Sequence, residues 1–367
     1  MPNDEEMFMR RALALAERGR GAVEPNPMVG AVLVRGGQIL AEGFHQRFGG
    51  PHAEIEALDA ARQAGADPTG ATMYVTLEPC CHHGKTPPCT DAILRARVGR
   101  VVAAMRDPDE NVAGRGLAIL RDAGVDVSLG LCESEARELL GPYIKLRTQH
   151  LPWCIAKWAQ TADGFLALPN GEGRWISSQE SRRRVHELRS RCDGVLVGVG
   201  TVQADDPLLT NRSGQGRTPT RVVLDSHLRT PPACRLVQTA NDAPLLIATI
   251  KQAAEERPEA VLALQRHGAE VLPLPADDDG RVSLPALLEE LGRREWTNLL
   301  VEGGETVLRA FLAAGLFDEL QVYVSPRLVG PADLPRLNVE DVLAGGAFSV
   351  RQRISVGDDA FLHCGCV

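Results

Sequence analysis

A histidine, a glutamate and two cysteines have the types and spacing of a metal site with its own proton carrier. One residue separates His52 from Glu54, and Cys80, which follows Pro79, is separated from Cys89 by eight residues. Two thiolates and one imidazole suit zinc, and three protein ligands leave a fourth tetrahedral position for water. Such water ionises near neutral pH and can attack an electron-poor ring carbon. We therefore predict His52, Cys80 and Cys89 as zinc ligands and Glu54 as the catalytic residue that carries protons.

These residues also have a purely structural interpretation, in which His52 and Glu54 are ordinary polar groups and the cysteines are small buried hydrophobes. His-x-Glu followed by Pro-Cys and a second Cys is the pattern of zinc-dependent deaminases, which favours the metal site. That pattern has two residues between its cysteines, so the eight found here require the loop to fold back. Cys81 is an alternative ligand, but consecutive side chains point in different directions and we prefer Cys80.

Length and charge limit the kind of protein. A chain of 367 residues predicts two domains, at roughly 150 residues per domain. The net charge is -8 and no run of lysine and arginine stands out, which argues against a nucleic-acid partner. No stretch approaches the roughly 20 apolar residues of a membrane span, and the N-terminus lacks an apolar signal core. We expect a cytoplasmic protein without a membrane partner.

The cysteines fit a reducing compartment. There are nine of them, an odd number scattered over a long chain, which favours free thiols over a disulfide framework. We expect the closing Cys364–Gly365–Cys366 to be a frayed tail.

Helices and strands alternate in the first half of the chain, which predicts a layered α/β domain with its site at the strand ends. A helix beginning at His52 and a strand ending just before Cys80 would bring the ligands together. The helical pattern ends around residues 147–152, so the predicted domains are 1–148 and 149–367. The predicted helices are 5–19, 53–64, 90–97, 114–123 and 133–140, and the predicted strands are 29–34, 38–43, 73–77, 100–105 and 125–129.

The second half predicts a largely parallel sheet, because its strands are continuous apolar runs. Its most informative stretch runs from Leu299 to Thr306, a strand followed by Gly303 and Gly304 and then a helix through Ala314. This arrangement suits a nucleotide phosphate, although a tight strand-to-helix turn also explains the glycines. The predicted strands are 153–160, 194–200, 221–225, 245–249 and 320–324, with two more near 350 and 361, and an arginine-rich helix covers 179–191.

Short motifs extend over both halves. In the first half they are Pro25–Gly30, His52–Glu54, Val75–Cys80, Gly84–Cys89, Asp107–Pro108 and Val112–Gly116; in the second they are Asp163–Gly164, Trp175–Ile176, Gly200–Val202, Ala204–Thr210 and Val301–Gly304. With these motifs the chain resembles the bifunctional deaminase-reductases of riboflavin biosynthesis over nearly its whole length. The eight-residue cysteine spacing belongs to this branch of the deaminases.

The resemblance implies a cytidine-deaminase-like three-layer α/β/α domain followed by a dihydrofolate-reductase-like α/β domain. The first would use Zn²⁺ to deaminate the small-molecule substrate 2,5-diamino-6-(5-phosphoribosylamino)pyrimidin-4(3H)-one. The second would reduce its ribosyl group to ribityl with NADPH, giving 5-amino-6-(5-phosphoribitylamino)uracil. The resemblance also suggests a homodimer through the second domain.

The resemblance carries residue roles with it. The deaminase substrate would contact Asn26, His45, His82 and Lys85. NADPH would contact Ala159, Trp175, Thr201, Asp205, Ser226, Gly304, Glu305, Thr306, Val307, Leu308, Arg309 and Ala310. The sugar phosphate would contact Gly173, Arg189, Leu209, Arg212 and Glu302. An arginine fork suits phosphate, yet Arg189 could equally be a solvated helix charge.

Three other functions are weighed against this one. A nucleic-acid base deaminase shares the metal chemistry but needs a basic surface. A non-enzymatic zinc module would close the metal with a fourth ligand, such as Cys81, His82 or His83. In a third possibility the second half is a degenerate assembly domain, against which the intact Gly303 and Gly304 argue.

Overall fold

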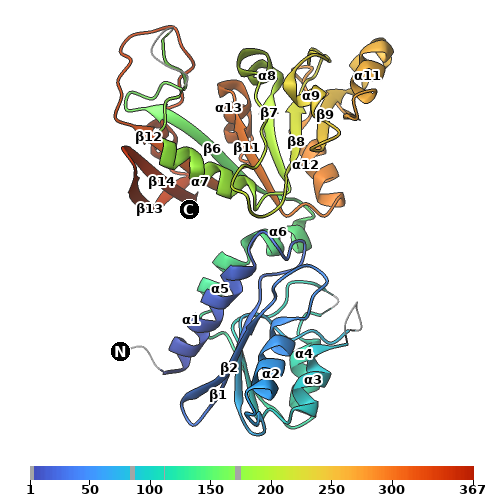
Figure 1. Cartoon of the computed structure of the whole chain (residues 1–367), viewed down its shortest axis with the longest axis vertical. Helices are drawn as coiled ribbons and strands as arrows, with labels where there is room; N and C mark the ends of the chain where they lie inside the picture. Colours follow the sequence, from blue (N-terminus) through green and yellow to red (C-terminus); the bar gives the residue numbers. More distant parts are fainter. Residues whose placement is uncertain (1–3, 83–86, 111, 170–174) are drawn as a thin grey trace. The chain divides into compact units, whose positions relative to one another are not determined.

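The chain forms two compact units, Met1–His150 and Leu151–Val367 (Figure 1). The structure is a computed structural model and describes residues 4–82, 87–110, 112–169 and 175–367. Within these residues no helix is both long and apolar enough to span a bilayer. Lys85 and Gly173, predicted to bind substrate, lie outside the described residues.

The first unit contains a five-stranded sheet in the order β2-β1-β3-β4-β5. Strand β1 pairs antiparallel with both β2 and β3, whereas β3, β4 and β5 are parallel. The strands are β1 Gly30–Arg35, β2 Gln38–Phe44, β3 Thr72–Val75, β4 Arg100–Ala103 and β5 Asp126–Leu129. The helices are α1 Asp4–Ala16, α2 Ala53–Gln63, α3 Cys89–Arg95, α4 Arg115–Asp122, α5 Glu133–Leu139 and α6 Gly141–Gln149, with a 3₁₀ turn at Glu17–Gly19.

Strand alternation divides the first unit into two cores. Val32 and Val34 of β1 pack on one face of the sheet with α1 and α5, while Ala31 and Leu33 pack on the other with α2, α3 and α4. Successive side chains of a strand point to opposite faces, so one apolar strand supplies both layers. Figure 1 shows these helices on the two sides of the sheet. The three-layer arrangement that the resemblance implies follows from this pattern.

The second unit contains a nine-stranded sheet in the order β10-β9-β8-β7-β11-β6-β12-β14-β13. The strands from β10 to β12 are parallel, as predicted, and the final hairpin is antiparallel at the sheet edge. The strands are β6 Trp153–Thr161, β7 Gly194–Gly198, β8 Thr220–Leu224, β9 Leu245–Ile250, β10 Glu270–Leu274, β11 Asn298–Gly303, β12 Glu319–Ser325, β13 Phe348–Val356 and β14 Asp359–Cys366.

Helices cover both faces of this sheet and bury two apolar clusters. Leu299 and Val301 pack on the face of α12 and α13, and Leu300 packs on the opposite face. The helices are α7 Gln179–Arg189, α8 Val199–Asp205, α9 Arg235–Gln238, α10 Lys251–Glu256, α11 Pro258–Gln265, α12 Leu284–Arg293, α13 Glu305–Ala313 and α14 Val339–Ala344.

Two expectations from the sequence are wrong. The strand predicted for 194–200 ends at Gly198, because helix α8 begins at Val199 and takes in Gly200. The closing cysteines are not a frayed tail: Cys364 is fully buried in β14, which pairs with both β12 and β13. Pairing on both sides orders the end of the chain, and no short-range pattern reveals it.

Candidate active sites

Three predicted ligands lie together at one edge of the first sheet. The Nδ1 atom of His52 is 3.4 Å from Sγ of Cys80 and 3.3 Å from Sγ of Cys89, and the three ligand atoms all lie within 4.8 Å of one another. Tetrahedral zinc with ordinary bond lengths places N and S ligands roughly 3.6 Å apart. The donor set and its spacing therefore fit Zn²⁺. Cys81 is outside this cluster, so the structure favours Cys80 over its neighbour.

Local structure explains how distant residues meet. His52 is the N-cap of α2, Cys89 is the first residue of α3, and Cys80 lies on the loop after β3. The loop folds back because the amide of Thr90 donates to the carbonyl of Cys80 at 3.2 Å. The amide of Cys89 also donates to Sγ of Cys80 at 3.4 Å. The fold-back that the eight-residue spacing requires is thus fixed by the first turn of α3.

The pKa values of the two cysteine thiols are shifted in opposite directions. Hydrogen bonds from the Cys89 side chain and from His52 lower the pKa of Cys80 to about 4. The neighbouring Cys80 sulfur and burial raise the pKa of Cys89. The same contact with Cys80 raises the pKa of His52. Because metal ligands must be deprotonated, binding a cation here would release protons.

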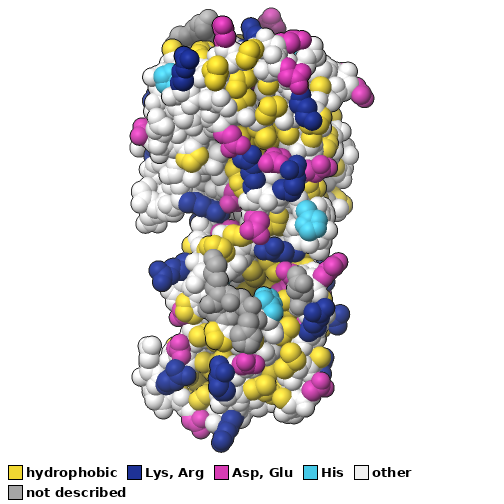
Figure 2. Space-filling model, turned by 90° about the vertical axis from the view of Figure 1, so that its right-hand side faces the viewer, with side chains coloured by type: hydrophobic (Ala, Val, Ile, Leu, Met, Phe, Trp, Pro, Cys, Tyr) yellow, Lys and Arg dark blue, Asp and Glu magenta, His cyan; other side chains and the backbone are white. Residues whose placement is uncertain are grey.

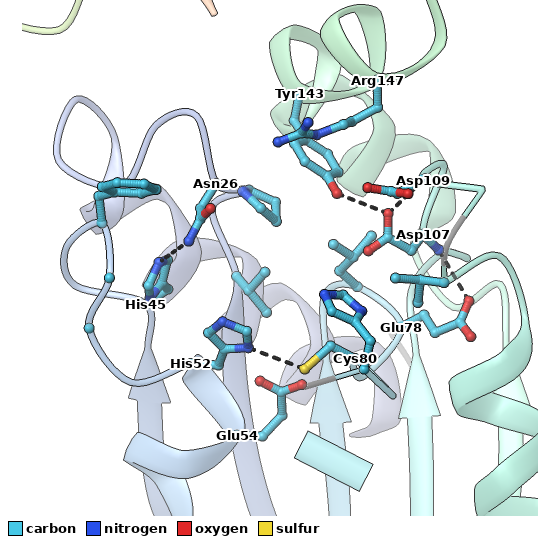
Figure 3. Close-up of a pocket in the computed structure, with 18 residues that line it drawn as sticks. Asn26, His45, His52, Glu54, Glu78, Cys80, Asp107, Asp109, Tyr143 and Arg147 are labelled. Carbon is cyan, nitrogen blue, oxygen red and sulfur yellow. Dashed lines mark hydrogen bonds between the residues drawn. The ribbon is translucent and has the colours of Figure 1, made fainter. Parts of the chain in front are cut away.

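Glu54 lies beside this cluster on the first turn of α2 (Figure 3). Its side chain is almost completely buried, with 3% of the residue exposed. Burial, together with the nearby Cys80, raises the pKa of Glu54 to about 7. A carboxyl group with such a pKa is suited to accept and return protons at neutral pH.

His52 and Cys80 of this cluster line a pocket with a volume of about 270 Å³ (Figure 3). Of the predicted deaminase-substrate contacts, Asn26, His45 and His82 line it. The His45 Nδ1–H donates to the carbonyl of Pro51 at 2.8 Å, so its Nε2 accepts from the amide of Asn26 at 3.1 Å. This pair leaves the Asn26 carbonyl oxygen free of His45. Burial lowers the pKa of His45, which favours its neutral form.

The opposite wall of the pocket was not predicted. Glu78, Asp107, Tyr143 and Arg147 line it, the last two from α6 (Figure 3). The Tyr143 hydroxyl donates to Oδ1 of Asp107 at 3.0 Å, and burial raises the pKa of Asp107 to about 6. The Asp107–Pro108 motif gave a signal for Asp107, but only the tertiary fold brings a helix from residues 141–149 to the same cavity.

Sheet order brings three of the predicted cofactor residues of the second unit to the same edge of the sheet. Thr201, Ser226 and Gly304 follow the carboxyl ends of β7, β8 and β11, which belong to the adjacent strands β8-β7-β11. Parallel strands end at the same edge, where α/β proteins bind ligands. Gly304 has φ +69°, and a Cβ on it would lie 3.1 Å from Oγ1 of Thr201. The predicted tight turn is therefore present, and glycine permits it.

Helix α13 begins at this turn without a side-chain cap at Gly304. Because glycine has no side chain, Gly304 itself cannot cap the first N–H groups of the helix, and such an N-terminus suits a phosphate. Leu308 is buried in the core, so its side chain does not face the strand ends, whereas Arg309 pairs with Glu305 at 2.7 Å. The remaining predicted members of the helix are Thr306, Val307 and Ala310.

Glu302 stands at an irregularity of the sheet. Val301 pairs with Leu196 and Gly303 with Val197, so Glu302 is an extra residue that bulges out of the β11–β7 ladder. Bulges re-aim side chains and occur next to active sites.

A buried ion pair holds the Glu302 side chain. Its carboxylate accepts from Nε and Nη2 of Arg189 at 2.6 and 2.8 Å, and Nζ of Lys157 lies 4.0 Å away. Burial alone would raise the pKa of Glu302, but Arg189 and Lys157 outweigh it and lower the pKa to about 2. Arg189 is not the solvated helix charge considered above, since 12% of its side chain is exposed. The fork that we expected to grip phosphate is instead engaged by Glu302. Sequence reasoning missed Lys157, which had no motif to mark it.

The other predicted residues of this unit have varied surroundings. Ala159 lies on β6 and packs against a small buried cluster, Asp205 ends α8, and Leu209 is buried with φ +53°. Trp175 is 54% exposed, with the guanidinium of Arg182 5.2 Å from its ring centroid. Arg212 is exposed, as a contact for an incoming anion would be.

Comparisons with known proteins decide the family. The RibD C-terminal domain model matches residues 152–342, and the model of the cytidine and deoxycytidylate deaminase zinc-binding region matches residues 2–105. The riboflavin biosynthesis protein RibD of Escherichia coli strain K12 is 41% identical over 377 residues, which cover 98% of each chain. The chain belongs to the RibD family. It joins a zinc-binding deaminase domain to a reductase domain and belongs to riboflavin biosynthesis.

Solved structures agree with this assignment. A diaminohydroxyphosphoribosylaminopyrimidine deaminase/5-amino-6-(5-phosphoribosylamino)uracil reductase from Thermotoga maritima has a TM-score of 0.85 and 37% identity, with 99% of each chain covered. A RibD structure from Acinetobacter baumannii has a TM-score of 0.83 and 33% identity over the same share. The predicted resemblance and fold class are thereby confirmed.

The face of the molecule in Figure 2 gives no support to the rival base deaminase. On the face shown in Figure 2, basic and acidic side chains are interspersed, and the described residues visible there form no broad basic tract. Nucleic-acid binding depends on many phosphate contacts from clustered lysine and arginine.

Proposed function

We propose that the first unit hydrolytically deaminates 2,5-diamino-6-(5-phosphoribosylamino)pyrimidin-4(3H)-one, with His52, Cys80 and Cys89 as the ligands of Zn²⁺. When bound, zinc lowers the pKa of water and so supplies a nucleophile at neutral pH. Glu54 would carry a proton from the attacking water to the departing amine, which leaves as ammonia. The observation that carries this proposal is the cluster of three ligand atoms beside a pocket that His52, Cys80 and the buried carboxyl group of Glu54 line.

Residues of the pocket walls would position the pyrimidine ring. Asn26, held by the neutral His45, presents an amide to the ring edge, and His82 lies at the exposed rim. The pocket of about 270 Å³ has room for a single pyrimidine ring.

In the second unit we propose reduction of the ribosyl group to ribityl with NADPH. The cofactor supplies the hydride, and the chain supplies binding and orientation. The first turn of α13 would hold the cofactor phosphates, together with Thr201 and Ser226 from the neighbouring strand ends. Trp175 and Asp205 complete the proposed cofactor contacts.

The sugar phosphate would lie at Glu302 and Arg212. Glu302 is ionised and fixed by Arg189, so it can accept hydrogen bonds from ribose hydroxyl groups. Arg212 is exposed and able to reach a phosphate, so it takes over the grip first assigned to Arg189. A homodimer through this unit and a cytoplasmic location complete the proposal.

One experiment tests both halves. The zinc-loaded protein is incubated with the diaminopyrimidine substrate, with and without NADPH, and the products are followed by mass spectrometry. We expect deamination alone without NADPH, a mass gain of about 1 Da, and a further gain of two hydrogens with NADPH. Ammonia release without reduction would leave the second half as an assembly domain, and an unchanged substrate mass in both arms would refute the proposal.

A further inference from the structure

The side chain of Glu78, which lines the pocket, accepts hydrogen bonds from four backbone amides. Its Oε2 accepts from the amides of Gly114 at 2.8 Å and Asp107 at 3.3 Å. Its Oε1 accepts from the amides of Gly116 at 2.9 Å and Leu117 at 3.2 Å. Glu78 is buried, with 3% of the residue exposed. Its single carboxylate thus accepts hydrogen bonds from four backbone N–H groups of one stretch of chain.

These four donors belong to the loop after β4 and to the start of α4. Gly114 is the N-cap of α4 and has no side-chain cap of its own. Glu78 therefore satisfies helix-terminal N–H groups that would otherwise be buried without partners. Its own amide donates to the carbonyl of Met105 at 3.0 Å, so the same residue ties the loop at both ends.

The four hydrogen bonds that the Glu78 carboxylate accepts, here called the Glu78 clamp, connect the metal cluster to the opposite pocket wall. Glu78 is followed directly by Pro79 and Cys80. The wall residue Asp107 accepts hydrogen bonds from Tyr143 and from the amide of Asp109 at 2.9 Å, and Glu78 accepts from its backbone. The contact is also tight, because a Cβ on Gly116 would lie 2.1 Å from the carbonyl oxygen of Pro79.

We propose that Glu78 is a positioning residue for deamination, which fixes the Asp107 wall at the correct separation from the His52–Cys80–Cys89 cluster. This inference rests on the proposed deaminase function. Glu78 acts through the wall and not on the reacting atoms. It should therefore govern how well substrate is held more than how fast the bound substrate reacts.

The substitution of Glu78 by glutamine distinguishes a positioning role from simple space filling. Glu78→Gln keeps the size of the side chain but replaces one acceptor oxygen with an NH₂ group that faces two N–H donors. A residue that only fills space would tolerate the exchange, whereas a four-donor clamp would not. Gly116→Ala is an independent second variant, since it pushes α4 away from Pro79 and leaves the carboxylate intact.

Both variants and a control are compared in the full chain loaded with zinc. The control is Asp193→Asn, which weakens a partly buried carboxylate that accepts from the amides of Thr297 and Asn298 at 2.8 Å in the second unit. For Glu78→Gln and Gly116→Ala we expect one zinc per chain and unchanged reductase activity on the deaminated substrate. We expect deaminase kcat/KM to fall about 10²-fold, mostly through KM, as for a misplacement near 1 Å. Hydrogen exchange of residues 105–117 should accelerate, and Asp193→Asn should change neither quantity.

The outcomes separate the two levels of the proposal. A wild-type protein that releases no ammonia refutes the deaminase function itself. An active wild type with normal KM and normal exchange in Glu78→Gln refutes the clamp alone. Loss of zinc, or a fall confined to kcat, would also overturn it, because Glu78 would then act at the metal cluster and not at the wall.

Discussion

Arg189→Met should destabilise the second unit at pH 7 because it leaves the Glu302 carboxylate buried without its main partner. The wild-type pKa of Glu302 lies at about 2, against an ordinary value of 4.5. That depression corresponds to about 3 kcal/mol of stability at pH 7, and removal of one partner from buried ion pairs typically costs ~3–5 kcal/mol. We expect a loss of about 3 kcal/mol.

The pH dependence has a definite sign. Because the folded-state pKa of Glu302 is depressed, its contribution is complete above the unfolded value near 4.5 and is lost as pH falls toward 2. Arg189→Met removes the cause of the depression. The variant should therefore lose less stability than the wild type between pH 4.5 and pH 3.

Urea unfolding followed by tryptophan fluorescence measures the effect in the intact chain. All four tryptophans belong to the second unit, so the signal reports that unit: Trp153, Trp158, Trp175 and Trp296. Arg293→Met is the matched control, because Arg293 pairs with Glu290 but 69% of its side chain is exposed. It should cost at most ~0.5 kcal/mol. Arg189→Met with Glu302→Gln should recover part of the loss, since no unpaired charge then remains. A loss below about 1 kcal/mol in Arg189→Met, or an unchanged pH dependence, would show that Arg189 does not hold Glu302.

Four further predictions concern the two sites. Glu54→Gln should retain zinc but lose ammonia release by ~10²–10⁴-fold, as measured by steady-state assay, and full turnover would remove Glu54 from the mechanism. Cys81→Ser should keep one zinc per chain by elemental analysis, while Cys80→Ser should lose it; the reverse result would assign the other thiol. Arg212→Ala should raise the KM for the sugar phosphate about tenfold or more through loss of a charged hydrogen bond, and wild-type kinetics would place Arg212 on the solvated surface. Chelation of zinc should abolish deamination and spare the reduction of deaminated substrate, and parallel loss of both activities would contradict separate sites.

Local patterns predicted much of the deaminase site. The His-x-Glu pair lies where a helix begins, and the β-branched run at 29–34 forms a strand with Gly36 and Gly37 at its turn. Such features depend on residues close in sequence, so periodicity and capping reveal them. The helix start at Val199 was missed because an apolar run with glycines reads equally as a strand.

The sequence by itself determined the chemistry: which side chains could bind a divalent cation, which could carry a proton, and which turns needed glycine. These properties belong to residue types and short spacings. Only the tertiary structure decided which partners each group has. It placed Arg189 and Lys157 on Glu302, put Tyr143 against Asp107, and gathered four amides on Glu78. Those contacts join residues from about 30 to more than 100 positions apart, and burial gives each its strength, so no local pattern encodes them.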